Sequence, residues 1–173
     1  AESLYSIAIG ESARASSNNA VAIGGNAPIS EGAYALSLGG GVAYSNDCIA
    51  IGNDSFAGRS GVPTSAIQAI AMGELVTSSE TNAIGMGKSI ISAGTGSIAM
   101  GVDCSAGYIS SMAIGLDNES DGLGSIAMGT RNWATGIDKT GLLNITDAKD
   151  GAMAFGIDCS ATGVAALAMG KEC

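Results

Sequence analysis

The side chains that could carry out chemistry are few in this chain. It has four cysteines, sixteen Asp and Glu residues, and no histidine at all. Histidine is the side chain that most often serves as a general base near neutral pH, and serine or aspartate constellations need such a base for hydrolysis. We therefore predict that the chain has no catalytic residue, binds no cofactor and is not an enzyme.

Three cysteines share one position of a repeat whose unit, the rung, is about 14 residues long. Cys104 and Cys159 lie about four rungs apart, near 20 Å, beyond the roughly 7 Å limit for a disulfide. Cys159 and Cys173 are one rung apart and could bridge, although we expect in-register stacking to give poor geometry. The favoured interpretation of all four, including Cys48, is a small buried apolar residue. With no histidine and no closely spaced cysteine pair, no metal site is predicted.

Four aspartates also share a position, two residues after a recurring glycine. A column of carboxylates could bind Ca²⁺, but the nine-residue glycine- and aspartate-rich calcium repeat is absent. Aspartate suits turns because its side chain bonds the local backbone. We therefore interpret these residues as turn formers: Asp54, Asp103, Asp117 and Asp158.

These positions belong to a five-residue phrase, first seen as residues 6–10, that recurs eleven times and always ends in glycine. The spacings between successive glycines are 14, 15, 13, 21, 14, 14, 14, 14, 27 and 14 residues. Such a period identifies a solenoid of stacked rungs. We expect a turn at every one of these glycines, because glycine tolerates unusual backbone angles: Gly10, Gly24, Gly39, Gly52, Gly73, Gly87, Gly101, Gly115, Gly129, Gly156 and Gly170.

Each phrase alternates large, small and large residues before its glycine, which is the period of a β-strand. Softer alternation after the glycine, as in Cys104 and Ala106, predicts a second strand and a second turn. Two strands and two turns per rung make a flat parallel roll. About eleven or twelve rungs would form a rod on the order of 50–60 Å long.

The alternation does not decide which residues face inward. We expect the large residues to fill the roll, which leaves the uncharged small residues as a smooth outer face. Such a face predicts a contact with another subunit. The opposite assignment, with the large residues outward, also requires a partner to cover them. The predicted subunit seam consists of Ala8, Ala22, Ala50, Ala71, Ala99, Ala113, Ala127, Ala154 and Ala168.

Charge and composition restrict the partners. The net charge is −9, with only seven Lys and Arg residues, which argues against nucleic acid and anionic membranes. No stretch approaches the roughly 18 apolar residues of a membrane span, so no direct membrane insertion is expected. Aromatic residues make up only 4% of the chain and glycine contributes 27 residues, as suits thin repetitive β-structure.

The repeated phrases Ser6–Ala15, Ala20–Ala27 and Ser125–Gly129 closely resemble the YadA-like head repeat of trimeric autotransporter adhesins. The resemblance covers almost the entire chain apart from two insertions. It implies a left-handed parallel β-roll and three chains side by side as a homotrimer. It further implies a surface-exposed segment that binds host components or other cells. The neck, heptad stalk and membrane anchor of that family are not found, and four cysteines are unusual for it.

Two insertions interrupt the single repeat domain of residues 1–173, near 58–66 and near 133–150. Recognition is expected there, because loops on rigid scaffolds carry variable function. The candidate contacts are Arg59, Pro63, Trp133 and Lys139; the hypothesis for Trp133 would be removed by an alanine variant that binds unchanged. The second insertion hides either a degenerate rung near Leu142–Asn144, which we favour slightly, or a long excursion.

We predict a non-catalytic adhesive or structural segment of a trimeric fibre, exposed on a cell surface or on a virion. A phage or viral fibre is the close alternative, since the same repeat occurs there. A single-chain ice-binding solenoid is less well supported because the threonines are scattered. Acyltransferase solenoids need a period of six and a histidine. Because Cys173 falls in the middle of a rung, we expect the segment to be part of a longer fibre. The sequence names no ligand.

Overall fold

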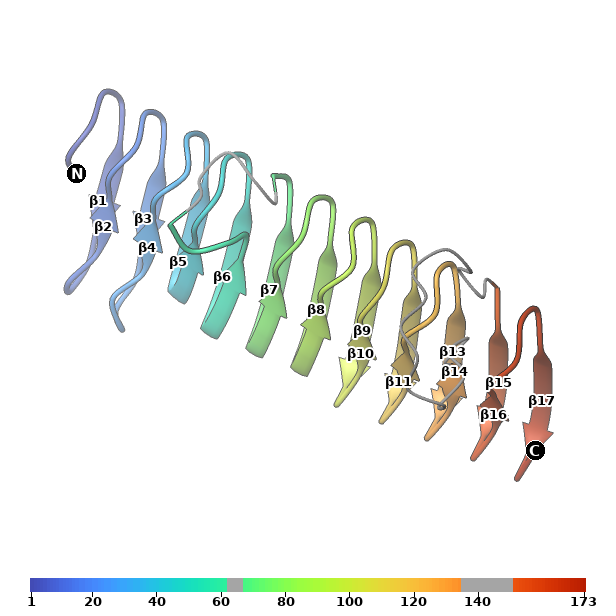
Figure 1. The fold of residues 1–173 in the computed structure, drawn as a ribbon. Helices are drawn as coiled ribbons and strands as arrows, with labels where there is room; N and C mark the ends of the chain where they lie inside the picture. Colours follow the sequence, from blue (N-terminus) through green and yellow to red (C-terminus); the bar gives the residue numbers. More distant parts are fainter. Residues whose placement is uncertain (62–66, 135–150) are drawn as a thin grey trace.

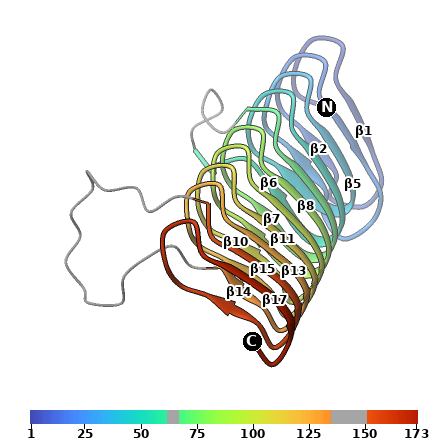
Figure 2. The ribbon, with the colours of Figure 1, turned by 90° about the vertical axis from the view of Figure 1, so that its right-hand side faces the viewer.

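A computed structural model describes residues 1–61, 67–134 and 151–173. Within these ranges the chain winds into one flat roll of parallel strands, and successive rungs follow the colour order from blue to red in Figure 1. The view along the roll in Figure 2 shows the rungs stacked behind one another as narrow loops. The prediction of an all-β parallel roll with 14-residue rungs is confirmed, with about ten turns.

Eleven strands contain the glycine-ended phrases and form one wall of the roll. In four of them the strand continues past the glycine through the bend into the opposite wall. The eleven are β1 (Ile7–Ile9), β3 (Val21–Ile23), β5 (Leu36–Ala43), β6 (Ile49–Ala57), β7 (Ile70–Ser78), β8 (Ile84–Ser92), β9 (Ile98–Val102), β11 (Met112–Leu116), β13 (Ile126–Thr130), β15 (Met153–Ile157) and β17 (Leu167–Lys171).

The opposite wall is made of short strands together with the later parts of β5, β6, β7 and β8. The short strands are β2 (Arg14–Ala15), β4 (Ile29–Ser30), β10 (Ser105–Ala106), β12 (Glu119–Ser120), β14 (Trp133–Ala134) and β16 (Ser160–Ala161). Every pairing is parallel and, apart from a register shift in β5 between Gly40 and Val42, joins equivalent positions of neighbouring rungs, as in Ala99 opposite Ala113. Each residue therefore lies directly above its equivalent, and the repeat becomes a set of columns.

The glycine that ends each phrase makes the bend between the two walls. Gly101 has a φ of +123°, and a Cβ built on it would collide with the carbonyl oxygen of Gly115 in the next rung. L-residues rarely adopt this backbone angle, and any side chain here would separate the two rungs. The expected glycine turns are therefore present, and both the backbone angle and the close approach of neighbouring rungs require glycine.

The interior of the roll is filled by small residues, which corrects the favoured expectation from the sequence. The middle residue of the phrase is fully buried in most rungs, as with Ala50 and Ala113 at 0% exposure, while its large neighbours such as Met100 and Ile114 are only half-buried and face outward. The walls of a two-strand rung leave no room for pairs of Ile or Met side chains. The alternative assignment, with large residues outward, is the one that the structure adopts.

Larger residues enter the interior at one place, and a smaller residue compensates for them. Val76 and Ile90 are both fully buried, at a position that small residues fill in most other rungs. Opposite them the phrase has Gly85 instead of alanine, and a Cβ there would lie 2.9 Å from Val76 Cγ1 and 2.7 Å from Ser78 Oγ. Total interior volume is thus conserved locally, as close-packed cores require.

The strands on either side of the 27-residue spacing are direct neighbours, so the slight preference for a hidden degenerate rung between them was wrong. Strand β13 pairs directly with β15, with Ile126 opposite Met153 in unbroken register. Strand β14 pairs in the same way with β16. No further rung fits between direct neighbours, and residues 142–144 lie outside the described part of the chain.

The Gly85 substitution tests this interior packing. We expect Gly85→Ala to lower the free energy of unfolding by about 1–3 kcal/mol, because the added methyl group overpacks a filled interior. Urea denaturation followed by circular dichroism measures the effect. The double variant Gly85→Ala/Val76→Ala serves as the control, and it should recover part of the loss. Equal stability of Gly85→Ala and the parent chain would contradict the packing argument.

Candidate subunit interface

The outward residues of the phrase wall form one continuous apolar face, which we call the apolar stripe. It has two columns, one on each side of the buried middle residue, and neither contains a charged side chain. The first column is Ile7, Val21, Leu36, Ile49, Ile70, Ile84, Ile98, Met112, Ile126, Met153 and Leu167; the second is Ile9, Ile23, Leu38, Ile51, Met72, Met86, Met100, Ile114, Met128, Phe155 and Met169.

The apolar stripe is large for a surface that meets water. Eleven strands at about 4.8 Å spacing make it roughly 48 Å long. With a width near 10 Å it covers on the order of 500 Å², at the upper end of what monomeric proteins expose. Side chains in successive rungs partly cover one another, which is why most members are half-buried in the single chain. Burial against a partner gains about 25 cal/mol for each Å² removed from water.

The outer face of the opposite wall has a different composition. Its column mixes apolar, polar and charged residues, among them Ile91 at 51% exposure, Trp133 at 39% and the charged Glu119. On this face Tyr44 stacks on Phe56, with 6.3 Å between the ring centroids. This mixture is typical of a solvated face, so the two outer faces of the roll are chemically distinct.

The structure contradicts the predicted seam residues. Ala22, Ala50, Ala71, Ala99, Ala113, Ala127 and Ala154 are all at 0% exposure inside the roll. Ala8 and Ala168 are in the same column and are half-buried. The seven fully buried alanines cannot contact another subunit while the roll is intact. The residues next to them, in the apolar stripe, are the ones available for such a contact.

The candidate ligand-contact residues do not come together. Arg59 follows β6, is exposed and forms an ion pair with Glu80 at 3.6 Å. Trp133 belongs to a rung, in β14, where it pairs with Glu119 and Ser160. Five rungs, roughly 24 Å, separate the two. Pro63 and Lys139 lie outside the described residues. Trp133 does face away from the apolar stripe, so it remains a candidate anchor.

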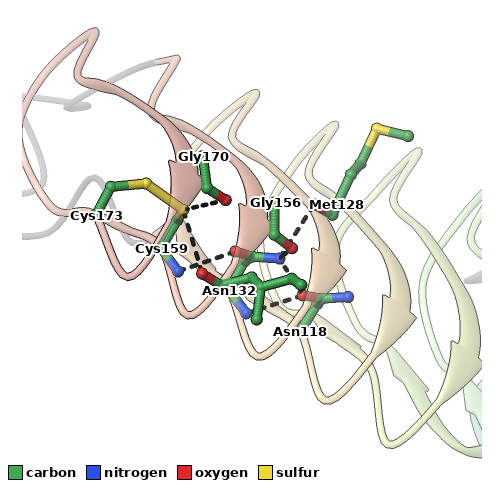
Figure 3. Close-up of a disulfide and its surroundings, with 8 residues drawn as sticks. Asn118, Met128, Asn132, Gly156, Cys159, Gly170 and Cys173 are labelled. Atoms are coloured by element: carbon green, nitrogen blue, oxygen red, sulfur yellow. Dashed lines mark hydrogen bonds between the residues drawn. A yellow bond between two sulfur atoms is a disulfide. The ribbon is translucent and has the colours of Figure 1, made fainter.

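Two of the four cysteines form a disulfide, which corrects the expectation that all four are unpaired apolar residues. Cys159 and Cys173 are bonded, with 4.5 Å between their Cα atoms. The spacing of neighbouring rungs falls inside the Cα range that a disulfide accepts, and both side chains lie in one column. Figure 3 shows the bond linking the two rungs.

The same column continues into a ladder of buried asparagines. Asn132 donates from Nδ2 to the carbonyl of Gly156 at 2.9 Å, and its Oδ1 accepts the backbone N–H of Cys159 at 3.0 Å. The backbone N–H of Asn132 in turn donates to Asn118 Oδ1 at 2.9 Å. Figure 3 shows these contacts in sequence toward the disulfide. We call Asn118, Asn132, Cys159 and Cys173 the interior ladder; sequence analysis missed the two asparagines, although they occupy the cysteine register.

The other two cysteines, Cys48 and Cys104, are buried and take no part in a disulfide, as expected. Cys104 lies in the column of the interior ladder and donates to the carbonyl of Gly115 at 3.4 Å. Burial raises the pKa of the Cys48 thiol above its ordinary value, against hydrogen bonds from the backbone that lower it. Both thiols fill space in the roll, and the raised pKa makes Cys48 a poor nucleophile near neutral pH.

The four aspartates occupy left-handed turn positions, with φ between +52° and +56°. Asp158 also forms an ion pair with Arg131 at 2.8 Å. The turn interpretation is thus supported by the backbone. Across the described ranges, no three His, Cys, Asp or Glu side chains converge as metal ligands would. Nor do those ranges contain a helix of the length and apolarity that crossing a membrane requires.

Comparison with known proteins agrees with this architecture. The family model for the YadA head domain repeat (2 copies) matches residues 1–27, 109–132 and 120–138. The chain carries YadA-like head repeats. The matches fall on the N-terminal rungs with β1–β3 and on the rungs with β11–β14, and the same phrase strands recur between these rungs and after them. No curated protein matches the chain. The head-repeat match favours an adhesin-like structural segment over an enzyme.

Asn132 tests the interior ladder. We expect Asn132→Ala to cost about 2–4 kcal/mol of unfolding free energy, because it removes the side-chain hydrogen bonds to Asn118, Met128 and Gly156 and leaves the buried Cys159 N–H without the Asn132 acceptor. Urea denaturation of the oxidised chain measures this. Asn53→Ala, at an exposed position of the bend, is the matched control and should stay within about 0.5 kcal/mol. Similar values for the two variants would argue against the ladder.

Proposed function

We propose that the chain is a non-catalytic head segment of a homotrimeric fibre outside the cell, and that three copies assemble through the apolar stripe. The fibre serves attachment to a surface or a host. The observation that carries the proposal is the stripe itself, an uncharged apolar face that runs the length of the roll. Head repeats supply the second line of support.

In such a fibre, one outer face of the roll would contact the other subunits and the other outer face would contact the attachment partner. The apolar stripe gains free energy when water is excluded from it, so it suits a permanent contact between identical chains. Threefold symmetry places the same face of each copy toward the shared axis. The mixed outer face of the opposite wall, with Trp133 and Ile91, then points outward, where an attachment partner reaches it.

The described residues give no support for chemistry at this surface. Charged groups in the bends form surface ion pairs, such as Lys88 with Glu74 at 3.4 Å, and not a convergent set. We favour a bacterial surface adhesin as the protein to which this segment belongs. The phage or viral fibre shares the same assembly and differs in the segments to which the roll is attached, so the flanking sequence discriminates between them.

The mass of the chain in solution tests the assembly. We expect light scattering to give three chains per particle and the mass to survive dilution. The double variant Met100→Glu/Ile114→Glu should give single chains with an unchanged circular dichroism spectrum, because two buried charges per copy would oppose assembly while the outward positions leave the roll interior intact.

The matched control is Ile91→Glu, an outward apolar residue on the opposite wall at 51% exposure. We expect this variant to keep the mass of three chains. A parent chain that is monomeric at micromolar concentration would remove the trimer from the proposal. If Ile91→Glu disrupted assembly as strongly as the double variant, the subunit contact would not be specific to the apolar stripe, and this part of the proposal would be wrong.

A further inference from the structure

We propose that the interior ladder is a redox-closed mechanical clamp: the Cys159–Cys173 disulfide locks the last two rungs of the described roll to each other, and Asn132 and Asn118 extend that hold across the junction between β13 and β15. The proposal concerns the four residues Asn118, Asn132, Cys159 and Cys173, which occupy one column in four successive rungs. It depends neither on trimer assembly nor on what the fibre binds.

Within the C-terminal half, the sequence separation between neighbouring phrase strands is largest between β13 and β15. Elsewhere in the C-terminal half a rung follows its neighbour after 14 residues, whereas Gly156 follows Gly129 after 27. A longer closed loop costs more entropy, so the rung that begins at β15 is held less tightly by the chain itself. Strand pairing between β13 and β15 must replace the missing short connection.

The interior ladder spans this junction with side chains. Asn132, on the near side, makes one bond to Gly156 and one to Cys159, both on the far side. Its own backbone N–H is held by Asn118 one rung earlier. No other column of the described roll joins two asparagines and a disulfide in series. Asn118, Asn132 and Cys159 are buried in the roll, and Cys173 is bonded to Cys159 at the exposed end of the stack (Figure 3).

The disulfide completes the series covalently. Cys159 is fully buried, and Cys173 is bonded to it one rung further along. The backbone N–H of Ser160 also donates to the carbonyl of Cys173 at 2.7 Å. With the bond closed, residues 160–172 cannot extend when the fibre is pulled along its axis. A force must then break the pairing of β15 with β13 and of β16 with β14 before further chain length is released.

The clamp closes by an oxidation that balances as a thiol–disulfide exchange. The two cysteine thiols lose two protons and two electrons to a small disulfide oxidant such as oxidised glutathione, which becomes two thiols. Such bonds persist in oxidising compartments and are reduced in the cytosol. The clamp is therefore open during synthesis and closes outside the cytosol, where a fibre bears load.

Pulling single chains tests the proposal. The 173-residue chain would carry Cys48→Ala and Cys104→Ser, so that only one cysteine pair remains. Alanine fills the position of Cys48 in neighbouring rungs at Ala35 and Ala69, and serine fills that of Cys104 at Ser55. We expect the chain oxidised with glutathione disulfide to release roughly 45 Å less contour length than the same chain in reductant, the span of 14 residues less the bridge.

Hydrogen exchange gives a second readout that needs no substitution. Reduction should speed exchange of the amides in β17 by roughly 100-fold, since a closed loop of this size stabilises by that order, and leave β7 and β8 unchanged. The matched control, with Cys159→Ser and Cys173→Ser, should respond to reductant in neither experiment. Equal contour lengths with and without reductant, or a reductant effect that persists in the control, would overturn the clamp. Alkylation of both cysteines in the oxidised chain would overturn it as well.

Discussion

In-register stacking of parallel rungs is the constraint on which the rest of this structure depends. Because Ala99 lies opposite Ala113, and each residue lies over its equivalent, any choice of side chain is repeated along the roll. A side chain that packs well at one position of the rung also packs well at that position in the other rungs. A side chain that packs poorly would cause the same defect in each rung that contains it. The bend glycines show the strictness of the constraint, since the carbonyl of Gly115 occupies the space that a Cβ on Gly101 would need.

The same constraint explains the polar residues of the interior. A bend turns a backbone carbonyl toward the inside of the roll, where it needs a donor. Ser55 donates to the carbonyl of Gly73 at 2.8 Å, and Asn118 donates to that of Gly129 at 2.8 Å. Where Val76 or Ile90 fills this column instead, apolar packing with Gly85 stabilises the rung. The interior thus uses two solutions along a single column.

Stacking also separates the outer faces. One column of Ile, Leu or Met produces an apolar strip as soon as it is repeated in every rung, while a column that varies produces a mixed surface. The roll has both, on opposite walls, and this asymmetry suits one face to assembly and the other to display. The excursion after β14 interrupts the chain without interrupting either face, because β13 and β15 stay paired.

The sequence by itself determined the repeat, the strands and the bends. Period-two alternation and a regularly spaced glycine reflect local backbone geometry, so both can be recognised in the amino-acid sequence alone. It could not determine which side of each strand is inside, since alternation defines two faces without naming one. That choice followed from the narrow space between the walls, which admits Ala113 and excludes Ile114.

Two further features were decided only by tertiary structure. The pairing of Cys159 with Cys173 depended on the distance between neighbouring rungs, 4.5 Å between Cα atoms, which the sequence spacing of 14 residues does not give. The length of the excursion depended on β13 pairing directly with β15, a contact between residues 27 apart. Both are long-range distances, whereas the repeat is a local pattern. The sequence determined the strands and bends of each rung. The stacking of rungs determined which side chains are buried inside the roll and which remain on the surface for a partner.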